Sequence, residues 1–201
     1  MINKSRSQFQ TYQGILSRTE QSHRLPINTR PGSHLRIVVE NQGRIGYGPL
    51  TGELKGITGN VTLGGVRLTD WKHSGSGNWS QIIQEINELP VRERNESTLD
   101  YEKPKLYRGN FVLQETPADT LLDPTGWGKG VAFINGHNLG RYWPAMGPQV
   151  TLYVPGVWLN PAPQNNTLIL INFEQDPCFG HIECEIGFSD KHVLDAPTPY
   201  K

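Results

Sequence analysis

Short extended runs that end in turn residues follow one another along this chain of 201 residues. The chain holds 22 Gly and 15 Pro, a combined share above the usual value of about 12%. Closely spaced runs bounded by turns are typical of the strands of a β-sandwich or jelly roll. We expect strands at 35–39, 61–63, 106–113, 131–134, 150–154 and 167–173.

Helical periodicity is found in one segment, residues 79–89 with the sequence WSQIIQEINEL. Its apolar residues recur near the spacing of one helix face. They are Trp79, Ile82, Ile83, Ile86 and Leu89. The pattern predicts one short helix in an otherwise β-rich chain.

The dipeptide Asn135-Gly136 joins two extended runs in GVAFINGHNLGRYW. A type I′ turn needs positive φ at both central residues, and Asn-Gly is the pair that adopts it most readily. The sequence therefore predicts a tight β-hairpin at this point.

The charges of the chain balance, with 19 Lys and Arg against 19 Asp and Glu. Without a net field, nucleic acid and anionic membranes are not expected partners. Residues 1–20 lack the apolar stretch of a secretion signal. The longest apolar runs, such as 168–171, are far too short to span a bilayer. We therefore expect a soluble chain without a signal peptide.

A charged segment that carries Pro90 and Pro104 divides the chain. It predicts a first β-domain at 1–89, a linker at 90–104 and a second β-domain at 105–201. Each part is small for a domain, and the abrupt polar start of the first indicates that its opening strands lie upstream. A complete α/β barrel needs about 250 residues, more than this chain has.

Two carboxylates are candidates for acid/base chemistry. Glycoside hydrolysis needs a pair of carboxyl groups around the scissile bond, and Glu40, followed by Asn41, could serve as a general acid. The preferred interpretation is a Glu at a strand end, bound by turn amides. Asp70, in LTDW, has no evident partner and is interpreted as a turn cap.

Nucleophile and phosphate motifs are not matched. No G-x-S-x-G elbow occurs, and GWGKGV departs from the phosphate-binding loop because Gly130, not Ser or Thr, follows Lys129. Gly126, Gly128 and Gly130 also miss the dinucleotide spacing. We interpret them as a tight turn leading into the hairpin and expect no cofactor.

Cys178, His181 and Cys184 have the spacing C-x2-H-x2-C. They could bind zinc with Asp176 or Glu183 as a fourth ligand. A disulfide between the two cysteines is the preferred alternative, since five intervening residues can close such a loop. Free thiols are the third possibility, and no metal site is predicted.

Five Asn-x-Ser/Thr triplets could accept a glycan in a secretory compartment. They begin at Asn3, Asn60, Asn78, Asn95 and Asn165. Their number, with a possible disulfide, favours that compartment and conflicts with the lack of a signal peptide. A lost upstream portion would resolve the conflict.

Five Trp and Tyr residues gather within 127–158. Flat aromatic faces stack on sugar rings, and Arg141 could bind hydroxyl groups. Packing in a core or a domain interface explains the same residues and is preferred; His137 is interpreted as a solvated turn residue. The five are Trp127, Tyr142, Trp143, Tyr153 and Trp158.

Residues 35–63 and 126–159 closely resemble the C-terminal β-domains of family 35 glycoside hydrolases, which include animal lysosomal β-galactosidases. The family signature K-G-x4-N-G-x2-L-G-R-Y-W is matched in full. The matching residues are Lys129, Gly130, Asn135, Gly136, Leu139, Gly140, Arg141, Tyr142 and Trp143. LTDW and the later DPC…C segment follow the family's order, so the resemblance spans most of the chain.

The resemblance implies an enzyme in which a catalytic barrel precedes the β-domains and removes terminal β-galactose with retention, using two glutamates of the barrel. Val39-Glu40-Asn41 imitates the start of the family's V-E-N-E-Y-G motif, but Gln42 replaces the second Glu. Glu40 also falls in a segment that aligns with a β-domain. No catalytic residue is therefore carried over to this chain.

The implied fold is all-β, with two jelly-roll, galactose-binding-like sandwich domains, the first of them incomplete. The implied role is support of a catalytic barrel, the expected partner, with dimerisation as a further expectation. Alternatives are a free carbohydrate-binding module and a structural module that docks on a separate barrel. By resemblance the location is lysosomal or secreted, and the Cys178–Cys184 bridge is expected.

Overall fold

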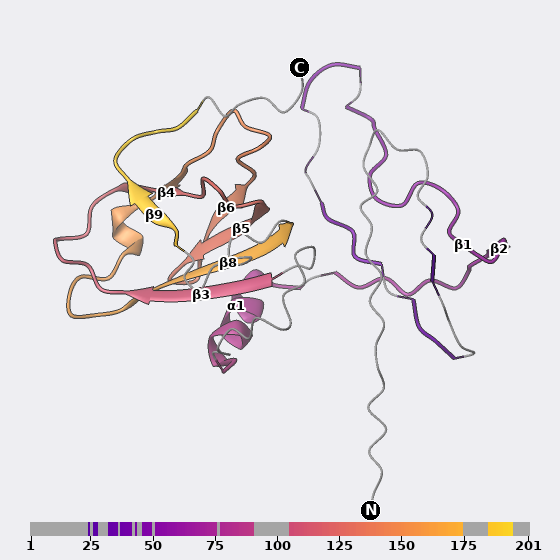
Figure 1. The fold of residues 1–201 in the computed structure, drawn as a ribbon, viewed down its shortest axis with the longest axis horizontal. Coiled ribbons are helices and arrows are strands. Elements are labelled where there is room, and N and C mark those ends of the chain that lie inside the picture. The colour runs from indigo at the N-terminus through magenta and orange to yellow at the C-terminus, as the bar shows by residue number, and fades with distance from the viewer. Residues whose placement is uncertain are drawn as a thin grey trace, which may run out of the picture. The chain divides into compact units, whose positions relative to one another are not determined.

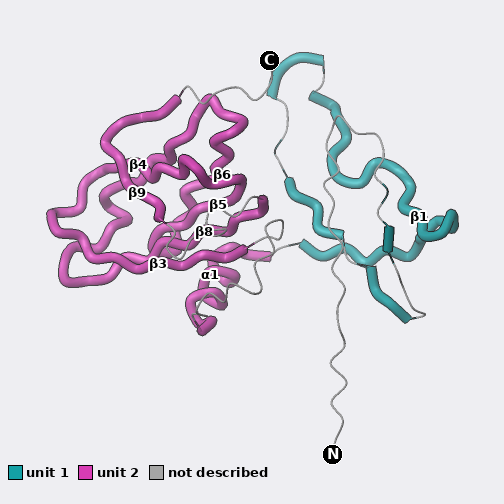
Figure 2. Tube along the Cα trace, in the orientation of Figure 1, with its two compact units in different colours: residues 1–76 teal, residues 77–201 magenta. Residues whose placement is uncertain are grey.

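The computed structural model separates two compact units, residues 1–76 and 77–201, shown in different colours in Figure 2. The structure describes residues 24, 26–27, 32–35, 37–41, 43, 46–49, 51–75, 77–90, 105–174 and 185–194. Each unit is described below by itself.

The regular structure described in the first unit is one hairpin. Strand β1 (Thr62–Leu63) pairs with β2 (Val66–Arg67) in antiparallel register. The turn between them consists of Gly64 and Gly65, both at positive φ, which only glycine adopts without cost. The strand expected at 61–63 is thus confirmed at 62–63.

The strand expected at 35–39 is wrong for the residues described there, which form no strand. Their side chains are largely solvent-exposed, up to 94% for Val38. An apolar run becomes a strand only when a neighbouring strand pairs with its backbone. Among the described residues of this unit, the strand pairing that is formed joins β1 to β2 and leaves out residues 35–39.

The second unit is a β-sandwich of two antiparallel sheets, labelled in Figure 1. Its four-stranded sheet has the order β3-β8-β5-β6, and its three-stranded sheet has the order β7-β4-β9. The first sheet consists of β3 (Lys105–Phe111), β8 (Asn166–Glu174), β5 (Lys129–Ile134) and β6 (His137–Tyr142). The second consists of β7 (Leu152–Val154), β4 (Thr120–Asp123) and β9 (Gly187–Ser189).

The main core lies between these two sheets and includes Leu122, Ile134, Val154 and Leu170, each at most 2% exposed. Side chains alternate between the faces of a strand, so one face of the four-stranded sheet supplies this core. The β-sandwich predicted from the sequence is confirmed, and so are the strands expected at 106–113, 131–134, 150–154 and 167–173, with small shifts at their ends.

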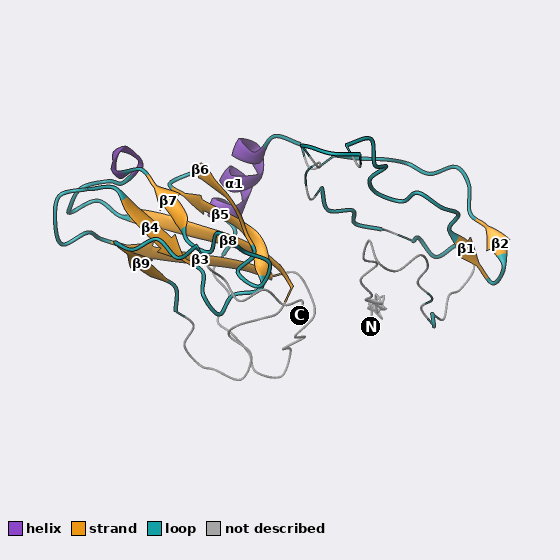
Figure 3. Ribbon diagram, turned by 90° about the horizontal axis from the view of Figure 1, so that it is seen from above, coloured by secondary structure: helices purple, strands orange, loops and turns teal. Residues whose placement is uncertain are grey.

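The other face of the four-stranded sheet is covered by helix α1 (Trp79–Glu88), as Figures 1 and 3 show. Ile83 and Ile86 of the helix pack on Phe133 and Ile169, and the ring centroid of Trp79 lies 5.3 Å from that of Phe133. Burying one apolar stripe of an amphipathic helix in this way is its main source of stability. The predicted helix is confirmed.

The helix belongs to the second unit, which begins at residue 77. The boundaries expected from the sequence, 1–89, 90–104 and 105–201, place it in the first domain instead. The difference has a physical reason, because ten residues of helix are marginal in water alone and these bury their apolar face on β5 and β8.

Arg108 of β3 ties the helix to the sheet at the helix C-terminus. Its guanidinium donates hydrogen bonds to the carbonyl oxygens of Ile86 (3.0 Å), Asn87 (2.7 Å) and Leu89 (3.1 Å). The last carbonyls of a helix have no partner within it and carry a partial negative charge. The guanidinium of Arg108 supplies N–H donors for these carbonyls and a positive charge that balances the partial negative charge.

We expect Arg108→Ala to lower the free energy of unfolding of the second unit by about 2 kcal/mol, because it removes charge-assisted bonds and leaves helix carbonyls unpaired. Urea unfolding followed by circular dichroism measures the change. Arg67→Ala, at an exposed position of β2, is the control and should stay within about 0.5 kcal/mol of the parent. Equal losses in the two variants would contradict this role of Arg108.

Candidate functional site

The signature segment forms the hairpin that the sequence predicts. Asn135 and Gly136 have φ values of 48° and 84°, as a type I′ turn requires. Ile134 and His137 pair directly on either side of the turn. The hairpin of β5 and β6 is therefore confirmed.

The side chain of Asn135 is held on both of its polar atoms. Its Nδ2 donates to the carbonyl of Trp158 and to Oδ1 of Asn166, each at 2.7 Å, and its Oδ1 accepts from the backbone N–H of Thr167 at 2.8 Å. Asn166 is fully buried and also binds both backbone groups of Asn160. A buried amide network with satisfied donors and acceptors fixes the turn to the start of β8.

A bulge in β6 follows the turn. Phe133 pairs with Asn138 and Ala132 with Gly140, which leaves Leu139 as an extra residue whose side chain packs on the main core. Gly140 has a φ of 108° and donates its N–H to Oδ1 of Asn138 at 2.8 Å. The conformation of Gly140 strongly disfavours a side chain.

The signature residues Gly130 and Tyr142 fit against each other. A Cβ atom on Gly130 would collide with the carbonyl oxygen of Ile171 and with the Tyr142 hydroxyl. That hydroxyl donates to Oδ1 of Asn172 at 2.9 Å inside the core, and burial raises the pKa of Tyr142 well above its usual value. The phenol therefore acts as a neutral structural donor.

Lys129 is buried at the start of β5, with 3% of its surface exposed. Its Nζ lies 2.7 Å from Oε1 of Glu174 at the end of β8 and 4.6 Å from the ring centroid of Trp143. The guanidinium carbon of Arg141 lies 5.9 Å from the same centroid. Two cations beside one indole, with a carboxylate on one of them, form an internal cation–π and ion-pair cluster.

The remaining aromatic residues lie elsewhere. Trp127 is buried and meets Tyr107 edge to face at 4.9 Å, and Trp158 stacks on exposed His137 at 4.6 Å. His137 begins β6 and Trp143 follows its end, so the rings of Trp158 and Trp143 lie near opposite ends of a strand of about 17 Å. The predicted core role is confirmed for Trp127 and Tyr142, while Trp143 and Trp158 are half-buried.

Tyr153, 52% exposed, shares a carboxylate with the backbone. Its hydroxyl donates to one oxygen of Asp119 at 2.7 Å, while the N–H of Gly156 donates to the other at 2.8 Å. These bonds, the backbone one first, lower the pKa of Asp119 below its usual value. Asp119 thus anchors the short 3₁₀ helix η2 (Gly156–Trp158).

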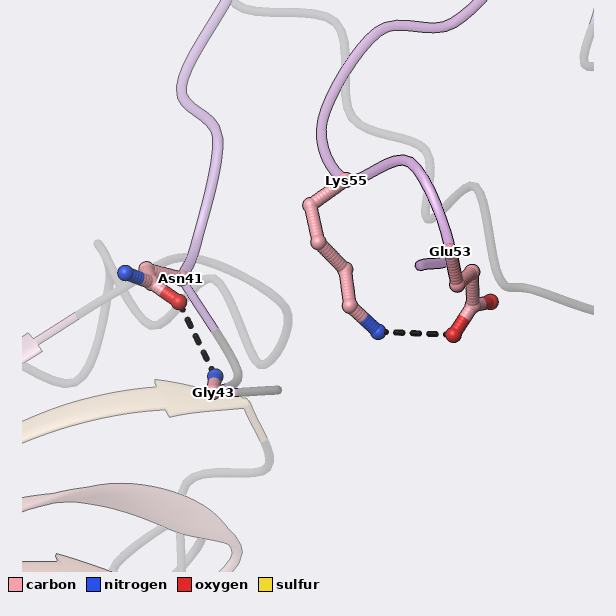
Figure 4. A network of polar contacts seen from close by, with 4 residues as sticks. All are labelled: Asn41, Gly43, Glu53 and Lys55. Carbon is pink, nitrogen blue, oxygen red and sulfur yellow. Dashed lines mark hydrogen bonds and ion pairs between the residues drawn. The ribbon is translucent and has the colours of Figure 1, made fainter. Parts of the chain in front are cut away.

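The candidate carboxylates of the first unit, Glu40 and Asp70, lie in irregular segments outside its strands. Asn41, which follows Glu40, accepts a hydrogen bond from the N–H of Gly43 at 2.9 Å, and Lys55 pairs with Glu53 at 2.9 Å (Figure 4). Asp70 is exposed, has a φ of 57° and accepts from the hydroxyl of its neighbour Thr69. The strand-end position expected for Glu40 is wrong, because the described residues before it form no strand, and the turn bond in this segment is made by Asn41.

Of the three glycines expected to form a tight turn before the hairpin, Gly126 lies in that turn, Gly128 follows it, and Gly130 is part of strand β5. The N–H of Trp127 donates to the carbonyl of Pro124 at 2.9 Å, and Gly126 between them has a φ of 86°. Asp123 accepts from the backbone and hydroxyl of Thr125. Strand β5 begins at Lys129, directly after this turn.

Comparison with known proteins agrees with this geometry. Residues 8–76 match the family model of the first all-beta domain of β-galactosidase, and residues 104–166 match that of the β-galactosidase galactose-binding domain. The chain carries β-domains of the β-galactosidases. The recognition of family 35 glycoside hydrolases made from the signature is thereby confirmed.

Curated relatives extend the match over nearly the whole chain. The chain is 36% identical to β-galactosidase of Canis lupus familiaris, 37% to that of Bos taurus and 35% to that of Homo sapiens. These alignments cover 93%, 90% and 94% of the chain. The chain spans only 30%, 30% and 29% of the respective relatives' lengths.

Some predicted sites of this β-galactosidase-like chain lie outside the described residues: Asp176, Cys178, His181, Glu183, Cys184, Asn3 and Asn95. The disulfide and the zinc alternative therefore stay predictions. Within the described ranges, no group of three or more His, Cys, Asp or Glu could hold a metal ion. No helix among them is long and apolar enough to cross a membrane. Asn60, Asn78 and Asn165 are exposed.

Several partners of the signature are polar residues that the sequence patterns did not indicate. In β8, Asn166 and Asn172 share the strand face of Leu168 and Leu170, which is the core-facing one. Polar residues in phase with core positions are a usable signal of a buried network. Asp119 carries no comparable local signal.

We expect Lys129→Met to lower the free energy of unfolding by about 2 kcal/mol, less than the roughly 3 to 5 kcal/mol of a fully buried pair, because Glu174 is partly exposed. A double-mutant cycle with Glu174→Gln, measured by urea unfolding, isolates the ion pair. Lys191→Met, at an exposed position, is the control. A coupling energy near zero would exclude the pair as a stabilising contact.

Proposed function

We propose that this chain is the non-catalytic β-domain region of a β-galactosidase and supports the enzyme's catalytic barrel. The observation that carries the proposal is the internal use of the signature residues, together with the two matched β-domain models. Lys129, Asn135 and Tyr142 all bind other residues of the chain itself. The signature therefore serves folding rather than a reaction.

The described carboxylates with known contacts point the same way. Asp119 anchors η2, Glu174 pairs with a buried lysine, and Asp123 closes a turn. Retaining glycosidases hold two carboxyl groups about 5 Å apart across a substrate cleft. Groups committed to caps, turns and ion pairs are poorly suited to that task.

The first unit supplies the surface for a partner. Its described residues contribute no apolar side chain to the buried cores, while Val38, Tyr47, Leu54 and Val66 are exposed by 94%, 94%, 77% and 68%. We infer that these side chains belong to one apolar patch, the kind of exposed surface that marks an interaction site. We assign the catalytic barrel as the partner that covers them.

A carbohydrate-binding module is the second candidate, favoured by the name of the matched galactose-binding model and by exposed Arg141 beside Trp143. Against it, two cations already lie beside the Trp143 ring. Calorimetric titration with galactose separates the two functions. Heat of binding that Trp143→Ala abolishes, with the fold retained, would favour the module.

We expect the purified chain to show no turnover of a chromogenic β-galactoside above the buffer rate, since the proposal places no catalytic group in it. Steady-state assays with and without the chain measure this. Glu40→Gln is the diagnostic variant. Turnover by the parent that this variant loses would refute the non-catalytic assignment.

The exposed apolar surface should bind a hydrophobic fluorescent dye in the folded chain. We expect Val38→Asp to reduce the dye signal at least about twofold, because a charge on an open apolar patch weakens dye binding. Val157→Asp is the matched control, since that valine is 90% exposed in the second unit. Equal reductions in both variants would show that the surface is not confined to the first unit.

A further inference from the structure

Asn135-Gly136 is the single Asn-Gly pair in the sequence, and this pair has a chemistry of its own. The backbone nitrogen of a glycine can attack the side-chain carbonyl carbon of the preceding asparagine. A cyclic succinimide forms, ammonia leaves, and water opens the ring to aspartate or isoaspartate. Glycine allows this readily because it has no side chain to hinder the approaching nitrogen.

We propose that Asn135 is a site of spontaneous deamidation that the fold keeps closed, and that the modified chain cannot regain the native structure. The site would then accumulate a permanent covalent change in proportion to the time that the second unit spends unfolded. Only water is needed as a co-reactant. The proposal stands on the contacts of the turn and is independent of the proposed function.

The hydrogen bonds of the Asn135 side chain prevent the reaction in the folded chain. Reaction requires the carboxamide to rotate toward the nitrogen of Gly136 and its Nδ2 to leave as ammonia. In the fold, Nδ2 donates to the carbonyl of Trp158 and to Asn166, while Oδ1 accepts from Thr167. Every polar atom of the reacting group must release a partner first.

The backbone of the turn is equally restrained. The N–H of Asn135 donates to the carbonyl of Thr167 at 2.9 Å, and β5, which ends at the turn, is paired with β6 on one side and β8 on the other. Opening the turn therefore disturbs the centre of the four-stranded sheet. A turn in the centre of a sheet opens only when the whole cooperative unit unfolds. We therefore expect the deamidation rate to be proportional to the fraction of molecules in which this unit is unfolded.

The product does not fit the native site. Once Asn135 has been converted to an aspartate, a carboxylate oxygen would face the carbonyl oxygen of Trp158 and Oδ1 of Asn166, where the amide now donates to both at 2.7 Å. Two attractive contacts would become repulsive in a largely buried network. Isoaspartate would also lengthen the backbone of a turn in which only two residues connect the strands.

The test compares the folded full chain with the chain unfolded in guanidinium, both incubated in ¹⁸O-labelled water at mildly alkaline pH. Peptide mapping by mass spectrometry measures acid formation at residue 135. We expect the folded chain to react at least about 100-fold more slowly, in line with the small unfolded fraction of a stable domain. Rates within tenfold of each other would overturn the closed state.

Two perturbations test the link to unfolding. Urea below the unfolding midpoint, and the core variant Leu122→Ala, should raise the rate in proportion to the unfolded fraction measured by circular dichroism. Lys191→Ala, at an exposed position, should leave the rate unchanged. A deamidation rate that stays constant while urea raises the unfolded fraction would refute the dependence on unfolding.

The fate of the product is tested with Asn135→Asp. We expect this variant to lose at least about 100-fold in its folding equilibrium constant, and the deamidated chain purified from guanidinium to fail to recover the native spectrum. Asn138→Asp is the matched control, because Asn138 lies at an exposed position of β6. Native stability of Asn135→Asp would show that the modified chain re-enters the fold.

Discussion

The carboxamide of Asn135 is the contact on which the arrangement of the second unit depends. It joins the turn between β5 and β6 to the first residues of β8 and to the end of η2. The turn precedes the other two segments by 23 to 32 positions, so these bonds join strands β5 and β8, which have no short connection. Because all of its groups are buried or half-buried, the network is strong only when complete.

The residues of the family signature are used in this structure for packing and for internal contacts. Gly130 makes room for the Tyr142 hydroxyl, Gly140 permits a bulge, and Lys129 neutralises Glu174 beneath an indole ring. None of these roles needs a substrate. These internal contacts therefore support our proposal that the chain is a non-catalytic β-domain region.

Elements that depend on neighbouring residues could be predicted from the sequence, and elements that depend on distant residues could not. The Asn-Gly turn, helix α1 and the long strands β3, β5 and β8 follow from neighbouring residues alone. Strands β4 and β9, of four and three residues, exist because they pair with each other, and no local pattern marks them. The run at 35–39 has the apolar pattern of a strand, yet its described residues pair with no strand in the described part of the chain. The bonds from Arg108 to α1 span 19 to 22 positions, beyond any periodicity.

The crowding around Gly130 has a consequence for inherited variation. A single added methyl group would push against a neighbouring strand's backbone and a buried phenol, and such overpacking commonly destabilises a core by about 1 to 3 kcal/mol or more, a loss large enough to change cellular abundance. We expect such a change to lower the amount of folded protein in the cell. A small molecule that binds and stabilises the folded state would counteract this loss.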